Sequence, residues 1–298
     1  MSTDVLPTTR PAGASAGKPR TYTLRARRPY GLWIASAWVL LLVGCAVAAD
    51  VLPLADPAKP VGRARQVPFH SLAPDQILGT DTYGRSVLSR VIFGARTDLL
   101  VTLCACAFGA VLGCLLGLLA GFVKGWADRA VSFLIDTLLA LPPIILLIAI
   151  ATILRPSTWT LTFGLTLLTV PAFARLERGA ALSWAERPFV LAARSYGASG
   201  LRIAFRQILP NSLLTVITFV PTVIAGLIVA EGSLGFLGLG IPPPAASWGT
   251  MIADGRASLR IAPHEVLVPA AVVFLTVLAL NTLGEKVRDR LEIRSRTG

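Results

Sequence analysis

Residues 97–122 read TDLLVTLCACAFGAVLGCLLGLLAGF, and after Asp98 no charged side chain interrupts the run. About 20 apolar residues suffice for a helix to cross a bilayer, so this run is long enough to span one. It carries a glycine at every fourth position near its end, namely Gly109, Gly113, Gly117 and Gly121. Residues four apart share one face of a helix, and small residues there let a second backbone approach closely. We predict a transmembrane helix whose glycine face packs against a neighbour, in this chain or in a partner chain.

The composition places the whole chain among membrane proteins. Apolar residues make up 54% of the 298 residues, charged residues only 15%, and the mean hydropathy is +0.69. An ordinary soluble domain has about 25% charged residues. The net charge of +12 raises nucleic acid as a partner, but a nucleic-acid-binding protein gathers its Lys and Arg on one soluble face, whereas here they separate apolar runs. We therefore expect membrane lipid, and no nucleic acid, around this chain.

Six apolar runs predict an all-α polytopic membrane protein with six transmembrane helices. They cover about residues 31–49, 97–122, 130–154, 158–174, 211–230 and 265–283. The first run has an alternative, because Leu42–Cys45 resembles a lipoprotein cleavage box and a cleaved leader would be removed. The run is about 19 residues long, against roughly 7–15 for the apolar core of a leader, which favours a span.

The polar segments complete the predicted organisation. Residues 1–30 form a basic N-terminal arm, 31–50 the first transmembrane helix, 51–96 an external loop, 97–284 a core of five spans, and 285–298 a tail. Within the core, residues 175–211 form the longest cytoplasmic connection between spans. With the N-terminus in the cytoplasm, 19 of the 28 Lys and Arg residues lie on the cytoplasmic side and 9 outside. This bias follows the positive-inside rule and predicts that both termini are cytoplasmic.

The end of the external loop predicts an amphipathic helix lying in the membrane interface between residues 84 and 95. One helical face would carry Val87, Leu88, Val91 and Ile92, and the opposite face would carry Arg85, Ser86, Ser89 and Arg90.

The sequence offers no arrangement for catalysis or for binding a metal or cofactor. The cysteines (Cys45, Cys104, Cys106 and Cys114) lie inside apolar runs without metal-binding spacing, and His70 and His264 are isolated. Residues 13–19 lack the spacing and the Ser or Thr of a phosphate-binding Walker A loop. We expect that the chain is not an enzyme and that its energy comes from another chain.

Three acidic residues lie in or near spans, where charge is costly and usually functional. They are Asp136, about six residues into the third run, and Asp98 and Glu231, near the outer ends of the second and fifth. We interpret them as candidates for a gate or a solute path. The alternative is a structural pair with an arginine, such as Arg96 or Arg90.

The cytoplasmic segment 175–210 predicts two short helices joined by a sharp corner. Pro188 suits the first turn of a helix over 187–196, and Gly197 suits its C-cap. Ser199 can cap a second helix, which Pro210 would end. On this second helix Leu201, Phe205 and Ile208 would share one face, leaving Arg202 and Arg206 free. Such a rigid protrusion is suited to being pushed by a partner protein.

The same segment, RPFVLAARSYGASGLRIAFRQILPN (187–211), resembles the cytoplasmic EAA loop of ABC-importer permeases. The family pattern is Glu-Ala-Ala, then Gly, then Ile-Leu-Pro, and Leu191 stands where the family has Glu. The resemblance implies that the loop docks into a cleft of an ATPase, with one polar contact missing at Leu191. The residues that we expect to carry this coupling are Arg187, Leu191, Ala192, Ala193, Gly197, Arg202, Arg206, Ile208, Leu209 and Pro210.

Further stretches resemble the dipeptide/oligopeptide/nickel branch of these permeases. They are LGTDTYGRSVLSRVIFGART (78–97), DTLLALPP (136–143), AEGSLGFLGLGIPPPAASWGTMIADGR (230–256) and LALNTLGEKVRDRLE (278–292). The resemblance implies the type I ABC-importer permease fold in a bacterial cytoplasmic membrane. It also implies a second permease chain, two ATPase subunits that bind ATP and Mg²⁺, and an external substrate-binding protein.

The resemblance implies alternating access driven by the ATPases, with a di- or oligopeptide as the commonest substrate. A metal complex such as a nickel chelate, or another small solute, is the alternative within the family. A protein of another class, an ion-coupled secondary transporter working alone, would need its own coupling site in the membrane. Asp136 is the candidate for that site.

Overall fold

The computed structural model describes residues 30–71 and 73–296, and the predicted basic arm lies almost entirely outside them. Apart from two isolated β-bridges in the external loop, the described residues form helices and connecting loops. The longer helices are α1 (Tyr30–Val47), α2 (Val87–Val123), α3 (Gly125–Ala140), α4 (Pro143–Ile153), α5 (Thr158–Ala185), α8 (Leu209–Phe236) and α10 (His264–Arg296). The shorter ones are η1 (Pro74–Gln76), α6 (Pro188–Ser195), α7 (Gly200–Ile203), the π-helical turn η2 (Ala204–Ile208), α9 (Trp248–Gly255) and η3 (Arg256–Ser258).

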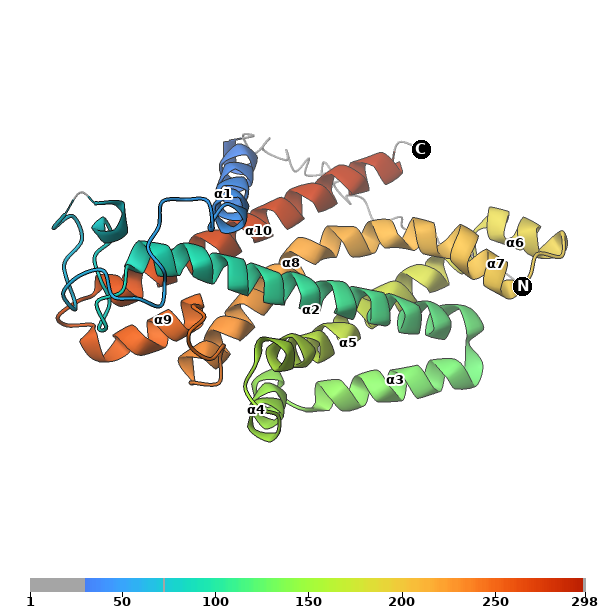
Figure 1. The fold of residues 1–298 in the computed structure, drawn as a ribbon. Coiled ribbons are helices and arrows are strands. Elements are labelled where there is room, and N and C mark those ends of the chain that lie inside the picture. The colour runs from blue at the N-terminus through green and yellow to red at the C-terminus, as the bar shows by residue number, and fades with distance from the viewer. Residues whose placement is uncertain (1–29, 72, 297–298) are drawn as a thin grey trace, which may run out of the picture.

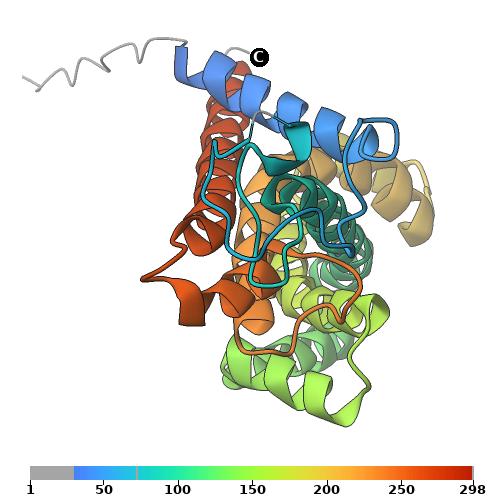
Figure 2. The same cartoon turned by 60° about the vertical axis from the view of Figure 1, so that its left-hand side comes forward.

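The all-α polytopic fold is confirmed. Five helical stretches are long and apolar enough to cross a membrane, and the number rises to six if α3 and α4 together count as one span. In Figure 1, α2, α5, α8 and α10 run lengthwise, with α6 and α7 at one end and α9 with the loop 48–86 at the other. We call the α6–α7 end the inner end and the opposite end the outer end, following the predicted orientation. Figure 2 shows α1 lying across the outside of this bundle, where the Trp38 indole N–H donates to Thr276 at 3.2 Å.

The prediction of a third span over 130–154 missed a break inside it, because α3 and α4 meet at an angle of 85°. Leu141 has extended backbone angles (φ −88°, ψ 133°), as a residue that precedes a proline tends to have. Pro142 is extended as well, and Pro143 then starts α4 at its first helical position. Two successive prolines thus end one helix and begin the next.

The glycine face of α2 lies directly against α5. A Cβ atom on Gly113 would come within 2.6 Å of the Phe173 Cβ, and one on Gly121 within 2.9 Å of the Ala181 Cβ. Gly109 lies against Thr169 in the same way, and Gly117 against the carbonyl of Ala174 and the side chain of Glu177. All four glycines therefore face one neighbouring helix of the same chain, and no side chain fits between the two backbones.

The prediction of a separate interfacial helix over 84–95 is also wrong. Residues from Val87 onward are the first turns of α2, which continues unbroken to Val123. Ser86 caps this helix by accepting the Ser89 N–H at 3.1 Å, and the Ser89 hydroxyl donates to the carbonyl of Ala55 in the external loop. Ser86, Ser89 and Arg90 are buried, because the external loop covers the polar face that the pattern alone assigned to solvent.

Helices extend further than expected into the segments that were predicted to be cytoplasmic. α5 continues to Ala185, so the connecting segment begins near residue 186 rather than 175, and α10 extends through most of the predicted tail. Pro210 does not end the second short helix, because α7, η2 and α8 form one continuous helical stretch, Gly200–Phe236. In the π-helical turn the Leu209 N–H donates to the carbonyl of Ala204, five residues earlier. Pro210 follows this wider turn and, having no N–H, fits where a donor is not needed.

Candidate coupling site and outer ion-pair cluster

The corner between α6 and α7 is built around Gly197. This residue has φ +77°, in the left-handed region that glycine adopts without a Cβ penalty. The Gly197 N–H donates to the carbonyl of Arg194 at 2.9 Å, and the Ala198 N–H to that of Ala193 at 3.0 Å. These bonds satisfy carbonyls at the end of α6 in the manner of a glycine C-cap. The chain therefore turns sharply into α7.

Ser199 occupies the predicted N-cap position of α7, but its side chain makes no capping hydrogen bond. Its carbonyl accepts the Ile203 N–H at 3.1 Å, which is the first bond of the next helix. The start of α7 thus depends on backbone geometry and on packing.

The corner is anchored to the inner ends of α2 and α5. We name residues 186–210 the knob. Its buried apolar side chains, Val190, Ile203, Ala204 and Ile208, form one cluster with Leu118 of α2 and with Ala181 and Ala185 of α5. Leu201 and Phe205, which we expected beside Ile208, are instead exposed, because the π-helical turn changes the register of side chains between them. The knob is consequently a packed extension of the bundle.

The outward face of the knob is both apolar and basic. Tyr196 is 90% exposed and Leu201 is 75% exposed, and Leu191 is half exposed at the position where the resembling family has Glu. The arginine side chains also face outward, namely Arg187, Arg194, Arg202 and Arg206. Arg187 lies over the Trp184 ring at 5.2 Å and Arg194 over the Phe122 ring at 5.4 Å. Exposed large apolar side chains among cations make this face suitable for contact with a second protein.

Of the other predicted coupling residues, Ala192 and Pro210 are exposed, whereas Ala193 and Leu209 are partly buried against the anchoring cluster. The predicted set therefore divides into a face that a partner can reach and a base that fixes the knob to the bundle.

Asp136, a candidate for the solute path, lies on α3 in an ion pair with α5. Its side chain is 65% exposed in this chain, and it accepts a hydrogen bond from Arg175 Nη2 at 2.7 Å. A second ion pair joins the same two helices, with Arg178 Nε and Nη2 donating to the Asp128 carboxylate at 2.6 and 2.8 Å. This ion pair fits the structural-pair alternative, with Arg175 of α5 as the partner rather than Arg90 or Arg96, and a role of Asp136 in a solute path stays a prediction.

Asp98 and Glu231 lie together at the outer end and are both buried. Asp98 Oδ2 accepts the Trp248 N–H at 2.9 Å, at the first residue of α9, where the helix dipole favours an acceptor. Ser247 caps the same helix end through the Thr250 N–H, and the Glu231 side chain also reaches Ser247. The two carboxyl groups therefore join α2 and α8 to the start of α9. Their role as a gate stays a prediction.

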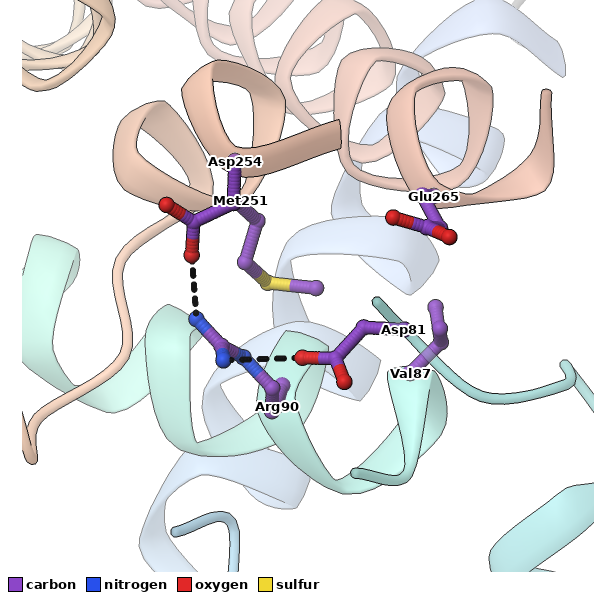
Figure 3. Close-up of a pocket in the computed structure, with 6 residues that line it drawn as sticks. All are labelled: Asp81, Val87, Arg90, Met251, Asp254 and Glu265. Atoms are coloured by element: carbon purple, nitrogen blue, oxygen red, sulfur yellow. Dashed lines mark hydrogen bonds and ion pairs between the residues drawn. The ribbon is translucent and has the colours of Figure 1, made fainter. Parts of the chain in front are cut away.

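An ion-pair cluster at the outer end was not predicted (Figure 3). Arg90 Nη1 lies 3.0 Å from Asp81 Oδ2, and Arg90 Nη2 lies 3.5 Å from Asp254 Oδ2. Arg85 pairs with the same two carboxylates at 2.7 and 3.6 Å. Burial raises the pKa of Asp254, an effect that Arg85 opposes. Asp81, Arg90 and Asp254 line a cavity of about 10 Å³, the size of one water molecule, and they link the external loop to α2 and α9.

Replacement of Arg90 by Met is expected to destabilise the outer end by about 2 kcal/mol, because it removes charge-assisted hydrogen bonds from a side chain that is only 5% exposed. The measurement is the thermal unfolding of the purified chain in detergent. Arg96→Met is the matched control, since Arg96 pairs with Asp50 at 2.6 Å but both side chains are about half exposed, and such pairs contribute about 0–1 kcal/mol. Equal effects of the two substitutions would contradict a special role for the buried cluster.

Comparison with known proteins points to one family. Residues 113–297 match the family described as "Binding-protein-dependent transport system inner membrane component". The glutathione transport system permease proteins GsiD of Escherichia coli O6:K15:H31 (strain 536 / UPEC) and Shigella boydii serotype 4 (strain Sb227) are each 42% identical over 214 residues. This alignment covers 72% of this chain and 71% of theirs.

The fold is similar to that of a chain in the inward-facing MetNI methionine ABC transporter. The TM-score is 0.52 and the sequence identity is 20%, and the match covers 66% of this chain and 96% of that one. At this identity the likeness concerns the fold alone.

Proposed function

Because the chain belongs to the family of binding-protein-dependent transport system inner membrane components, and so is the permease subunit of an ABC importer in a bacterial inner membrane, we propose that it carries small peptide-like solutes by alternating access driven through the knob. The observation that carries this proposal is the shape of the inner end. A rigid corner with an exposed apolar and basic face is anchored on α2 and α5 and continues directly into α8.

The continuity of α7, η2 and α8 supports a path for force. A push on α7 acts on one helical stretch that runs from Gly200 to Phe236. Near its outer end, Gly235 lies so close to α9 that a Cβ atom on it would come within 2.8 Å of the Gly249 carbonyl carbon. A displacement at the inner end would therefore reach α9 and the external loop, where the solute enters.

The energy source in this proposal is outside the chain. ATP and Mg²⁺ bind to two ATPase subunits, one of which docks on the knob of this chain. A second permease chain completes the path, and an external binding protein delivers the solute. The exposed apolar side chains of the knob, Leu191, Tyr196 and Leu201, are the anchors that we expect the ATPase to cover.

The proposed substrate class comes from the relatives. The two GsiD proteins are named for the transport of glutathione, which is itself a tripeptide. We therefore expect a small peptide or a peptide-like solute.

The test is uptake of radiolabelled glutathione and of a simple tripeptide by cells with and without this chain. Deletion of the chain is expected to lower uptake of at least one of them tenfold or more. Deletion of the ATPase subunits is expected to have the same effect, and an ionophore a smaller one. Unchanged uptake of every peptide in the chain-deleted cells would refute the substrate class. Uptake that persists without the ATPases would refute the energy source.

A further inference from the structure

Glu177 of α5 is a fully buried carboxyl group that neither the knob nor the outer cluster uses. Its Oε1 lies 2.5 Å from the Ser212 hydroxyl of α8, and its Oε2 has no hydrogen-bond partner in the described part of the chain. It lies at the glycine seam, which we define as the contact of Gly109, Gly113, Gly117 and Gly121 of α2 with α5. A Cβ atom on Gly117 would come within 2.8 Å of the Glu177 Cβ. Three helices, α2, α5 and α8, therefore surround it.

Among the residues that the structure describes, no cation is placed to neutralise this carboxyl group. The neighbouring arginines of α5, Arg175 and Arg178, point to the carboxylates of Asp136 and Asp128 on α3. Residues 99–123 of α2 and 211–230 of α8 contain no charged side chain, and the titratable group that α2 presents to Glu177 is the Cys114 thiol. An ionised Glu177 would thus be an unpaired buried charge, and a carboxyl group in such a place binds a proton instead.

The hydrogen bonds of Ser212 point the same way. Its oxygen lies within hydrogen-bonding distance of two acceptors, Glu177 Oε1 at 2.5 Å and the carbonyl of Leu209 at 3.1 Å. A serine hydroxyl has one proton to donate. If Glu177 is protonated, its O–H donates to the Ser212 oxygen and the Ser212 O–H donates to Leu209, so that each contact has a proton of its own.

We propose that Glu177 is a proton-binding site, and that its bound proton holds the inner end of α8 against α5. Release of the proton would leave a buried negative charge beside Ser212, two residues after Pro210 at the base of the knob. The packed chain would hold a proton that the unfolded chain has lost by neutral pH, so stability falls as the pH rises. A consequence for transport rests on the proposed function. Loss of the proton at alkaline cytoplasmic pH would loosen the knob, and uptake would fall.

Infrared spectroscopy of the assembled transporter in lipid tests the site directly. The spectrum near neutral pH is expected to contain the carbonyl band of a neutral carboxylic acid that disappears in Glu177→Gln and shifts in Ser212→Ala. The band is expected to fade as the pH is raised. If no neutral carboxyl band depends on Glu177 or Ser212, the carboxyl group is ionised and the proposal is overturned. The Ser212 variant keeps the test valid if Glu177→Gln does not fold.

Two further readouts separate the site from its consequence for transport. The melting temperature of the wild-type transporter is expected to fall by about 3 °C per pH unit between about pH 5 and the pH at which the band fades, because there the packed chain keeps the proton that the unfolded chain has lost, and that of Glu177→Gln to stay flat there. Equal slopes for both would overturn the stabilising role of the proton. Peptide uptake is expected to fall at alkaline cytoplasmic pH in the wild type and to stay constant in Glu177→Gln. A fading band with constant uptake in both would overturn the link to transport and leave the proposed function intact.

Discussion

Gly197→Val is expected to lower peptide uptake tenfold or more while the transporter still assembles and its ATPase subunits still hydrolyse ATP. Gly197 has φ +77°, where a β-branched residue is strained by about 1–3 kcal/mol. No atom lies within 4 Å of the position that its Cβ would take, so crowding does not contribute. The strain is relieved only if the corner opens and α6 turns away from α7. A push by the ATPase on the knob would then no longer act along α7 and α8. The measurements are uptake in cells and ATP hydrolysis by the purified transporter.

Two matched variants decide whether the effect belongs to this corner. Gly197→Asn is expected to retain most of the uptake, because Asn tolerates the left-handed region far better than Val. Gly238→Val introduces the same strain at φ +79° beyond the outer end of α8, also without crowding, and is expected to lower uptake less. Wild-type uptake in Gly197→Val, or an equal loss in Gly238→Val, would show that the corner does not transmit force from the ATPase.

Features with a local cause were predictable from the sequence. The four-residue spacing of Gly109 to Gly121 predicted a smooth helix face, because helical periodicity depends only on neighbours in the chain. The corner at Gly197 was predictable for the same reason, since Pro188 and Gly197 are local start and stop signals. The spacing did not identify the neighbouring helix, which the structure shows to be α5.

One further break carried a local signal that the apolar run obscured. Pro142 and Pro143 stand side by side in the middle of the predicted third span, and the residue before a proline tends to leave the helical region. A count of apolar residues passes over them. The 85° bend between α3 and α4 is the result.

Features that depend on distant residues could not be derived from local pattern. Arg90 looked solvent-facing because its helical neighbours alternate in polarity, but Asp254, 164 residues away, and the folded external loop bury it. Asp136 lies among apolar residues in sequence, which gives no sign of its partner, Arg175, 39 residues away. Glu177 drew no attention within a basic segment, and only the packing of three helices isolates it from its neighbouring arginines. In each case burial is decided by tertiary contact.

These tertiary contacts connect the two ends of the molecule. Glu177 and Ser212 join α5 to α8 beside the knob, whereas Asp98 joins α2 to the start of α9 near Glu231 of α8. α8 therefore makes polar contact with its surroundings at both ends and has only apolar and hydroxyl side chains between them, with Asn211 at its start. In the proposed function, a displacement at the inner end of α8 is passed along this helix to the contacts at its outer end.

Gly113→Val is expected to reduce the stability of the chain by about 3 kcal/mol or more, the upper end of the range for overpacking a dense interior. A Cβ atom there would lie 2.6 Å from the Phe173 Cβ, 2.8 Å from the Val170 carbonyl oxygen and 3.0 Å from the Ala174 nitrogen. Two of these three atoms belong to the backbone of α5, so a rotamer change cannot relieve the clash. The helices must separate, and close backbone approach is what holds helices together in a membrane. The measurements are the yield of folded chain in the membrane and its thermal unfolding in detergent.

Gly226→Val is the matched control for this seam. Gly226 also lies inside a spanning helix, α8, but it is exposed and nothing lies within 4 Å of the position of an added Cβ. The same substitution there leaves packing within the chain unchanged, and only a small effect of helix propensity, about 0.5 kcal/mol, remains. If Gly113→Val were as stable as Gly226→Val, α2 and α5 could not approach as closely as the glycine spacing and the structure both require. The glycine seam would then not be the contact that organises the bundle. Glu177, which this close approach buries, would not be isolated from its neighbouring arginines either.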